Sequence, residues 1–293
     1  MAALRYDTVS FLSDYGRRDE FVGVVHSVIR STAPEAAVID ITHDIPRHDV
    51  RAGGLTLARS AQYLCPGVVL AVVDPGVGTD RRAIAIEVGD AESVLVGPDN
   101  GVLAPAVAMV GGATRAVALT NTEYHLPAPG PTFDGRDVFA PVAAALCIGA
   151  DFDDLGDPVD PHELTPGILP VAREEDGDLV AEVMWIDGFG NCQLNLDPED
   201  IEGWGDVLRM TINGEWRTVR RVDSFADIGE GQIGLIVDSY GLLAIALDRR
   251  SAEAELGVRA SSEIRVQPVD EQGAADTAGV STQVELGRRN GGV

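Results

Sequence analysis

The 293-residue sequence contains no lysine, and its 22 basic residues, all of them arginine, face 47 acidic ones, which gives a formal net charge of −25. The arginines form no basic stripe of the kind that neutralises a phosphate backbone, and this excludes nucleic acid as a partner. The same acidity disfavours an anionic membrane surface. We therefore expect no nucleic-acid partner and no membrane partner, whereas a small cationic substrate is compatible with the charge.

Cysteine and long apolar runs are also scarce. Cys65, Cys147 and Cys192 are odd in number and lack CxxC spacing, which argues against a disulfide framework and against a zinc site. The 5 histidines show no metal-ligand spacing, so we predict no metal. No apolar run reaches transmembrane length and residues 1–7 lack a signal-peptide core, so the sequence predicts a cytoplasmic protein.

What the sequence does contain is an alternation of apolar runs and helical periods. Over residues 1–165 this alternation predicts an N-terminal α/β domain with a largely parallel central sheet. Prolines from 158 to 170 indicate a linker. Over residues 171–268, short apolar runs between glycine turns predict a smaller C-terminal antiparallel β domain of barrel type. Residues 269–293 have the composition of a disordered tail.

The segment Val73-Asp74-Pro75-Gly76-Val77-Gly78-Thr79 is the most informative part of the chain. It ends an apolar run that is typical of a strand buried on both faces. Asp74 therefore stands at the carboxyl end of a buried strand, where open α/β sheets bind their ligands. An ordinary strand-to-loop turn explains the Asp-Pro-Gly triplet equally well when it is taken alone.

Four other segments also place acids after strands or before helices. Asp14 follows the first strand, and Asp99 lies in a segment typical of a turn. Asp134 stands at the start of a helix expected near 138–148, a position that acids commonly take. The segment 187–191 has the spacing of a hairpin turn. No single segment identifies a function.

Together the segments resemble the S-adenosylmethionine (SAM) hydrolases, also called SAM hydroxide adenosyltransferases, which are related to the fluorinase and the chlorinase. The resemblance covers nearly the whole chain. Its six motifs are Ser13-Asp14, Ile39-Asp40-Ile41-Thr42-His43, Val73-Asp74-Pro75-Gly76-Val77-Gly78-Thr79, Pro98-Asp99-Asn100-Gly101, Thr132-Phe133-x-Gly135-Arg136-Asp137 (where x is position 134) and Ile186-Asp187-Gly188-Phe189-Gly190-Asn191. It implies a homotrimer with SAM at subunit interfaces, where the α/β domain of one subunit meets the β domain of a neighbour.

The resemblance also implies catalytic residues. The water-activating acid and arginine of the family correspond to Asp74 and Arg81, and a third position corresponds to Asp134, where the hydrolases carry histidine. Two carboxylates then stand near one arginine, and mutual repulsion is expected to raise the pKa of one of them and make it a better base. His125, nine residues earlier, is another group that could reach the same pocket. A change from histidine to aspartate at position 134 that weakens the activity fits the sequence equally well.

Substrate-binding residues are implied in both domains. Asp14 corresponds to the acid that binds the ribose hydroxyls, and His48 stands where the halogenases carry a tryptophan over the substrate. In the C-terminal domain the matching residues are Asp187 for the methionine ammonium group, Phe189 for stacking on adenine, Asn191 for amide pairing with adenine, and Ser239 for the amino-acid end.

The reaction implied by the resemblance is hydrolysis of SAM to adenosine and L-methionine, with an activated water attacking ribose C5′. SAM is the substrate, and no cofactor is needed. A SAM-dependent halogenase is an alternative, but a carboxylate such as Asp74 repels a halide in a desolvated pocket, and the fluorinase has serine where this chain has Gly135. A non-catalytic SAM- or adenosine-binding protein is the second alternative, because Asp134 replaces the family's histidine.

Overall fold

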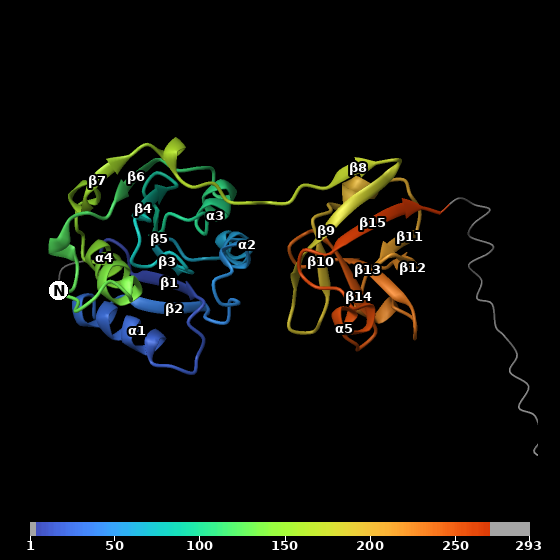
Figure 1. Cartoon of the computed structure of the whole chain (residues 1–293), viewed down its shortest axis with the longest axis horizontal. Helices are drawn as coiled ribbons and strands as arrows, with labels where there is room; N and C mark the ends of the chain where they lie inside the picture. The colour runs from blue at the N-terminus through green and yellow to red at the C-terminus, as the bar shows by residue number, and fades with distance from the viewer. Residues whose placement is uncertain (1–3, 270–293) are drawn as a thin grey trace, which may run out of the picture. The chain divides into compact units, whose positions relative to one another are not determined.

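The computed structural model describes residues 4–269, so the tail expected from residue 269 onward lies, apart from Val269 itself, outside the described residues. The chain divides into two compact units after Leu169, and each unit is described by itself (Figure 1). Among the described residues, no helix has the length and the apolar character needed to cross a membrane.

The N-terminal unit is a seven-stranded sheet with helices on both faces (Figure 1). The strand order is β2-β1-β3-β5-β4-β6-β7; the first four strands are parallel, and β4, β6 and β7 join as antiparallel neighbours. The predicted α/β class is confirmed, with a sheet that is mixed. The elements are β1 (Thr8–Ser13), α1 (Phe21–Thr32), β2 (Ala37–Thr42), α2 (Val50–Ala61), β3 (Val68–Val72), β4 (Ala83–Val88), β5 (Ser93–Pro98), α3 (Ala104–Met109), β6 (Arg115–Ala118), α4 (Ala140–Cys147) and β7 (Asp157–Val159).

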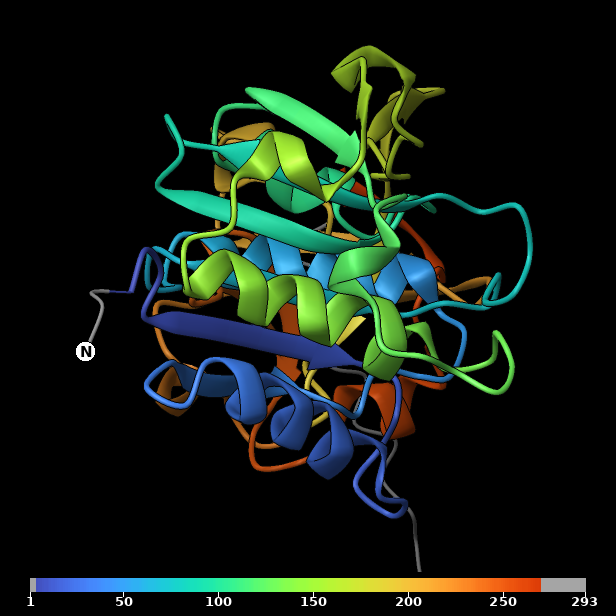
Figure 2. The same cartoon turned by 90° about the vertical axis from the view of Figure 1, so that its left-hand side faces the viewer.

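Two hydrophobic cores, one on each face, hold this sheet. Successive side chains of a strand point to opposite faces, so β1 gives Phe11 to the core under α1 and α4, and Leu12 to the core under α2 and α3. Figure 2 shows α4 in front of the sheet and α2 behind it. Every residue of β1 and β3 is buried, which explains why β3 reads as a continuous apolar run, whereas β1 also buries the hydroxyl groups of Thr8, Ser10 and Ser13.

The C-terminal unit is a closed, mostly antiparallel barrel. Its strands follow the order β10-β14-β13-β12-β11-β15-β9, the pairing of β9 with β10 closes the ring, and β8 adds to the outside of β9. Only the β12–β13 pair among these described strands is parallel. The predicted barrel-type domain is confirmed. The elements are β8 (Arg173–Glu175), β9 (Asp178–Ile186), β10 (Cys192–Leu194), β11 (Val207–Ile212), β12 (Glu215–Arg221), β13 (Ile233–Val237), β14 (Leu243–Leu247), α5 (Ala252–Leu256) and β15 (Glu263–Pro268).

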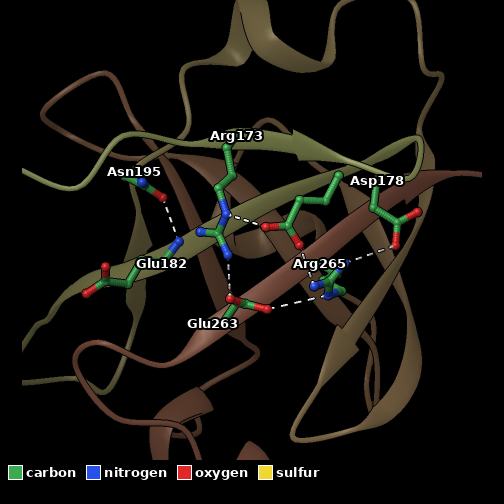
Figure 3. A network of polar contacts seen from close by, with 7 residues as sticks. Arg173, Asp178, Glu182, Asn195, Glu263 and Arg265 are labelled. Atoms are coloured by element: carbon green, nitrogen blue, oxygen red, sulfur yellow. Dashed lines mark hydrogen bonds and ion pairs between the residues drawn. The ribbon is translucent and has the colours of Figure 1, made fainter.

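A network of ion pairs crosses β8, β9 and β15 on the barrel surface (Figure 3). Arg173 donates to Glu175 at 2.6 Å and to Glu263 at 2.9 Å, and Arg265 donates to Glu175 at 2.7 Å. These side chains are a third or more exposed, so solvent screens each pair and its contribution to stability is small. Their effect is to favour one register for the short outer strand β8.

Several elements differ from the sequence-based expectation. Pro158 lies in the edge strand β7, a place where a missing backbone N–H is tolerated, so the linker between the units begins later than expected. The helix expected near 138–148 begins instead as a π-helical turn at Gly135–Phe139 and continues as α4. Strands β6, β7, β8 and β10 were not predicted, because runs of three or four residues carry too little periodicity.

Candidate active site

Two acids are brought to one edge of the N-terminal sheet by parallel pairing. Ser13 at the end of β1 lies opposite Val72 at the end of β3, and the backbone N–H of Asp14 donates to the Val72 carbonyl at 3.4 Å. Asp14 and Asp74 therefore leave the sheet at the same end. This edge is where ligands of open α/β sheets bind, as the sequence predicted.

Arg81 joins Asp74 to Asp134. Its Nε donates to Asp74 Oδ1 at 3.1 Å, and its Nη2 donates to Asp74 Oδ2 at 2.5 Å and to Asp134 Oδ2 at 2.6 Å. The side chains of Arg81 and Asp74 are 9% and 6% exposed, and that of Asp134 is 19% exposed. The guanidinium group also lies 5.5 Å from the Phe139 ring centroid. The structure thus brings the three predicted catalytic residues into one buried cluster.

A close backbone contact holds the two loops of this cluster together. Gly78 has φ +76°, and a Cβ placed there would be 2.6 Å from the carbonyl oxygen of Pro131. Only glycine fits both the left-handed backbone and the short contact. The loop that carries Asp74 and Arg81 therefore packs directly against the loop that leads to Asp134.

The pKa of Asp74 is raised, as was expected for one acid of the pair, but the main cause differs. Burial of the carboxyl group raises it most, Arg81 opposes the shift, and the negative charge of Asp134 adds to it. Asp134 also acts on His125, whose pKa is lowered by burial and partly restored by that charge. His125 is not among the residues that line the cavity.

A cavity of about 570 Å³ opens beside the cluster. Asp14, His48, Asp74 and Asp134 all contribute to its wall. The backbone N–H of His48 donates to Asp14 Oδ2 at 2.8 Å, and His48 itself has φ 66°. The volume lies in the range of pockets that hold small ligands. Each predicted site residue of the N-terminal unit is thus on the wall of this cavity or, like Arg81, bonded to residues that are.

Several residues of the wall were missed in the sequence. Tyr15, Phe21 and Phe133 form an aromatic cluster with ring centroids 5.1–5.7 Å apart, and further polar residues of the lining are Asp19, Arg47, Thr132 and Arg136. Tyr15 and Phe133 adjoin Asp14 and Asp134 in their motifs, so adjacency was a usable signal for these two. Phe21 opens α1 and carries no local signal.

The turn at Asp99 and Asn100 makes hydrogen bonds to residues next to Asp74 and Arg81. Asp99 accepts hydrogen bonds from Arg82 Nε at 2.8 Å and from the backbone N–H of Thr165 at 2.8 Å. Asn100 Nδ2 donates to the Val73 carbonyl, also at 2.8 Å. These contacts agree with the structural interpretation of this turn.

His43 lies at the centre of a second polar cluster. Its Nδ1 is 2.8 Å from Ser13 Oγ, its carbonyl accepts from the Gly16 N–H at 2.7 Å, and its Nε2 is 3.1 Å from Asp40 Oδ1. His26 Nε2 lies 2.7 Å from the same oxygen. The three side chains at 26, 40 and 43 are close enough to hold a cation. Their contacts are also those of an anchor for the loop that carries Asp14, the role predicted for His43.

In the C-terminal unit, the predicted hairpin turn joins β9 to β10, and hydrogen bonds to the Asp187 carboxylate hold the turn. Asp187 Oδ1 accepts from the N–H groups of Phe189 and Asn191 at 2.9 Å, and Oδ2 accepts from Asn191 Nδ2 at 2.8 Å. The Phe189 side chain is left 83% exposed. Phe189 and Asn191 line a cavity of about 720 Å³ together with Phe225. Ser239, in the β13–β14 turn, is not part of that wall.

This fold and these motifs define a class of protein. Residues 9–156 match the SAM hydroxide adenosyltransferase N-terminal domain and residues 181–265 match the SAM hydroxide adenosyltransferase C-terminal domain. The chain belongs to the SAM hydroxide adenosyltransferase family, which confirms the resemblance drawn from its motifs.

Individual relatives place it further within that family. The chain is 43% identical to the (R)-S-adenosyl-L-methionine hydrolase of Salinispora tropica, with 88% of this chain and 97% of that protein covered. It is 39% identical to the (R)-S-adenosyl-L-methionine hydrolase of Thermus thermophilus, covering 88% and 98%. A fluorinase of Nocardia brasiliensis is 26% identical, covering 90% and 97%. The crystal structure of an uncharacterized conserved protein from Thermotoga maritima superposes with a TM-score of 0.81 at 32% identity, covering 88% and 99%.

Proposed function

We propose that this protein hydrolyses SAM to adenosine and L-methionine, and that Asp74, Arg81 and Asp134 hold the attacking water. The observation that carries the proposal is the buried Asp74–Arg81–Asp134 cluster beside a cavity of nucleoside size. SAM carries a sulfonium group, so methionine leaves ribose C5′ as a neutral thioether when an oxygen nucleophile attacks in line.

The raised pKa of Asp74 suits it to accept the proton of that water. Full deprotonation of water at pH 7 would cost about 12 kcal/mol, which one arginine does not supply. Proton transfer to Asp74 as the C–O bond forms avoids this cost. Arg81 then keeps both carboxylates in place. Positioning of the water in line with the C5′–S bond lowers the activation barrier by several kcal/mol more.

We propose Asp14 as the ribose ligand and His48 as a further wall of the site. Asp187, Phe189, Asn191 and Ser239 are proposed to bind the methionine and adenine ends from the C-terminal unit. We further propose residues 1–165 and 171–268 as the two domains, with the complete site at the subunit interfaces of a homotrimer. The exposed Phe189 ring, which no described residue of its own unit covers fully, supports this assembly.

Incubation with SAM in H₂¹⁸O tests the reaction. We expect adenosine and methionine in equal amounts, with ¹⁸O in the 5′-hydroxyl. Added chloride or fluoride should give no halogenated nucleoside, because the carboxylates repel an anion. Tight SAM binding without adenosine would instead identify a non-catalytic binding protein.

Asp74→Asn tests the assignment of the proton acceptor. We expect kcat to fall by at least about 100-fold, because an amide accepts no proton. SAM affinity, measured by calorimetry, should stay within about threefold. Asp80→Asn is the matched control, since Asp80 lies in the same loop and is exposed. An Asp74→Asn enzyme with the rate of the wild type would refute the assignment.

A further inference from the structure

Tyr15 places a neutral hydroxyl group among the charged residues of the N-terminal cavity. Its ring is packed between Phe11, Phe21 and Phe133, with centroids at 6.4, 5.7 and 5.5 Å. This packing fixes the direction of the phenol. The hydroxyl end reaches the start of the π-helical turn, because a Cβ built on Gly135 would lie 2.0 Å from Tyr15 Oη. The phenol oxygen therefore fills the space that a side chain at position 135, next to Asp134, would take.

The phenol hydroxyl has no hydrogen-bond partner among the described residues, whereas three carboxylates of the same wall are engaged. Within the described part of the chain, Tyr15 Oη forms no hydrogen bond, whereas Asp74 and Asp134 are bonded to Arg81 and Asp14 accepts from the His48 N–H. Ionised carboxylates only accept hydrogen bonds, but a phenol both donates and accepts. Burial, with the negative charges of Asp14, Asp74 and Asp134, raises the pKa of Tyr15, so it stays protonated.

We propose that Tyr15 is a catalytic residue, and that its hydroxyl holds the attacking water in the place where the hydrolase pattern has a histidine at position 134. The inference rests on the proposed hydrolysis. The hydroxyl of Tyr15, which has no hydrogen-bond partner among the described residues, accepts one hydrogen bond from the water. The second hydrogen of the water points to Asp74, which leaves a lone pair of the water free to attack C5′.

The step balances without any other reactant. The water oxygen forms the bond to C5′, the C5′–S bond breaks, and its electron pair stays on sulfur as neutral methionine. The proton released from the water passes to Asp74 and later to solvent. Tyr15 is unchanged at the end, because it orients the water and transfers no proton.

Tyr15→Phe tests this role, because it removes one oxygen and keeps the packed ring. We expect kcat for SAM to fall by about 10- to 100-fold, with the affinity for adenosine and the melting temperature unchanged. Tyr63→Phe, at an exposed tyrosine, should leave kcat unchanged. If wild-type protein makes no adenosine, the proposed function fails. If it does and Tyr15→Phe retains the wild-type kcat, or weakens only adenosine binding, the water-holding role is wrong.

Gly135→Ala provides a second, independent test. The added methyl group collides with Tyr15 Oη and displaces the hydroxyl, so we expect a loss of kcat similar to that of Tyr15→Phe. In the Tyr15→Phe background the nearest ring atom is Cζ, at 3.0 Å, and the collision is much weaker. The double variant should therefore fall to about the level of Tyr15→Phe alone. Losses that multiply in the double variant would show that Gly135 and Tyr15 act separately and would overturn the proposal.

Discussion

Arg81 binds two carboxylates with one guanidinium group, so the cluster carries one negative charge in excess when both acids are ionised. On the wall of the same cavity, Asp14 and Asp19 add two negative charges and Arg47 and Arg136 offset them, so one negative charge remains in excess. A site of this sign attracts a sulfonium and repels a halide, and the effect is strong because the groups are largely buried. At the scale of single residues, charge therefore favours water over chloride or fluoride as the nucleophile, and the more distant identity to the fluorinases agrees with this.

The pH dependence of the reaction should depend on Asp134. As proton acceptor, Asp74 must be ionised, so kcat/KM should fall as the pH drops through its raised pKa. Asp134→Asn removes a negative charge that raises this pKa, so the acid limb of the kcat/KM profile should move to lower pH. Initial rates across pH 4 to about 9 measure the shift.

The control for this prediction is Asp80→Asn, which removes a charge from an exposed position of the same loop and should leave the acid limb in place. An acid limb that stays unchanged in Asp134→Asn, or moves to higher pH, would mean that Asp74 is not the group that titrates.

At the scale of elements, the contact between two loops keeps the acids together. Gly78→Ala should destabilise the protein by about 1–3 kcal/mol, because its Cβ meets the Pro131 carbonyl and its backbone is left-handed. It should also lower kcat, since the loops of Asp74 and Asp134 must separate. Gly111→Ala is the control that separates backbone strain from the steric contact. Gly111 has φ +95° with open space around it, so an alanine there adds backbone strain alone, and this variant should keep full activity. Urea unfolding and SAM turnover are the measurements.

The sequence predicted those elements whose side-chain pattern is local. Strand β11 was predicted with its observed bounds, and Asp14 and Asp74 were placed at one edge because parallel strands align their carboxyl ends. The insertion of β5 between β3 and β4 was not predictable, since it depends on which strands pair and not on their pattern. The bond from Arg81 to Asp134 joins residues 53 positions apart and came only from the family resemblance.

At the scale of the whole molecule, the site residues fall into two groups, one in each unit. The N-terminal group contains the acids proposed as proton acceptor and ribose ligand, whereas the C-terminal group contains an exposed aromatic ring and an amide. The contacts proposed for SAM are therefore divided between the two units. The homotrimer proposed here would bring the groups together from neighbouring subunits, and cyclic symmetry would then give three equivalent sites.

Mixed oligomers test whether each site combines two subunits. One chain carries Asp74→Asn, and the other carries Phe189→Asp, which places a charge at an exposed position where stacking is proposed. Each variant alone should be inactive. In a randomly mixed ring, a site is intact when its N-terminal domain comes from the second chain and its C-terminal domain from the first, so about one quarter of the sites should be active. Co-expression with two affinity tags, followed by sedimentation and SAM turnover, measures this fraction. If every chain held a complete site of its own, the mixed oligomers would be inactive, because each chain would carry one disabling substitution.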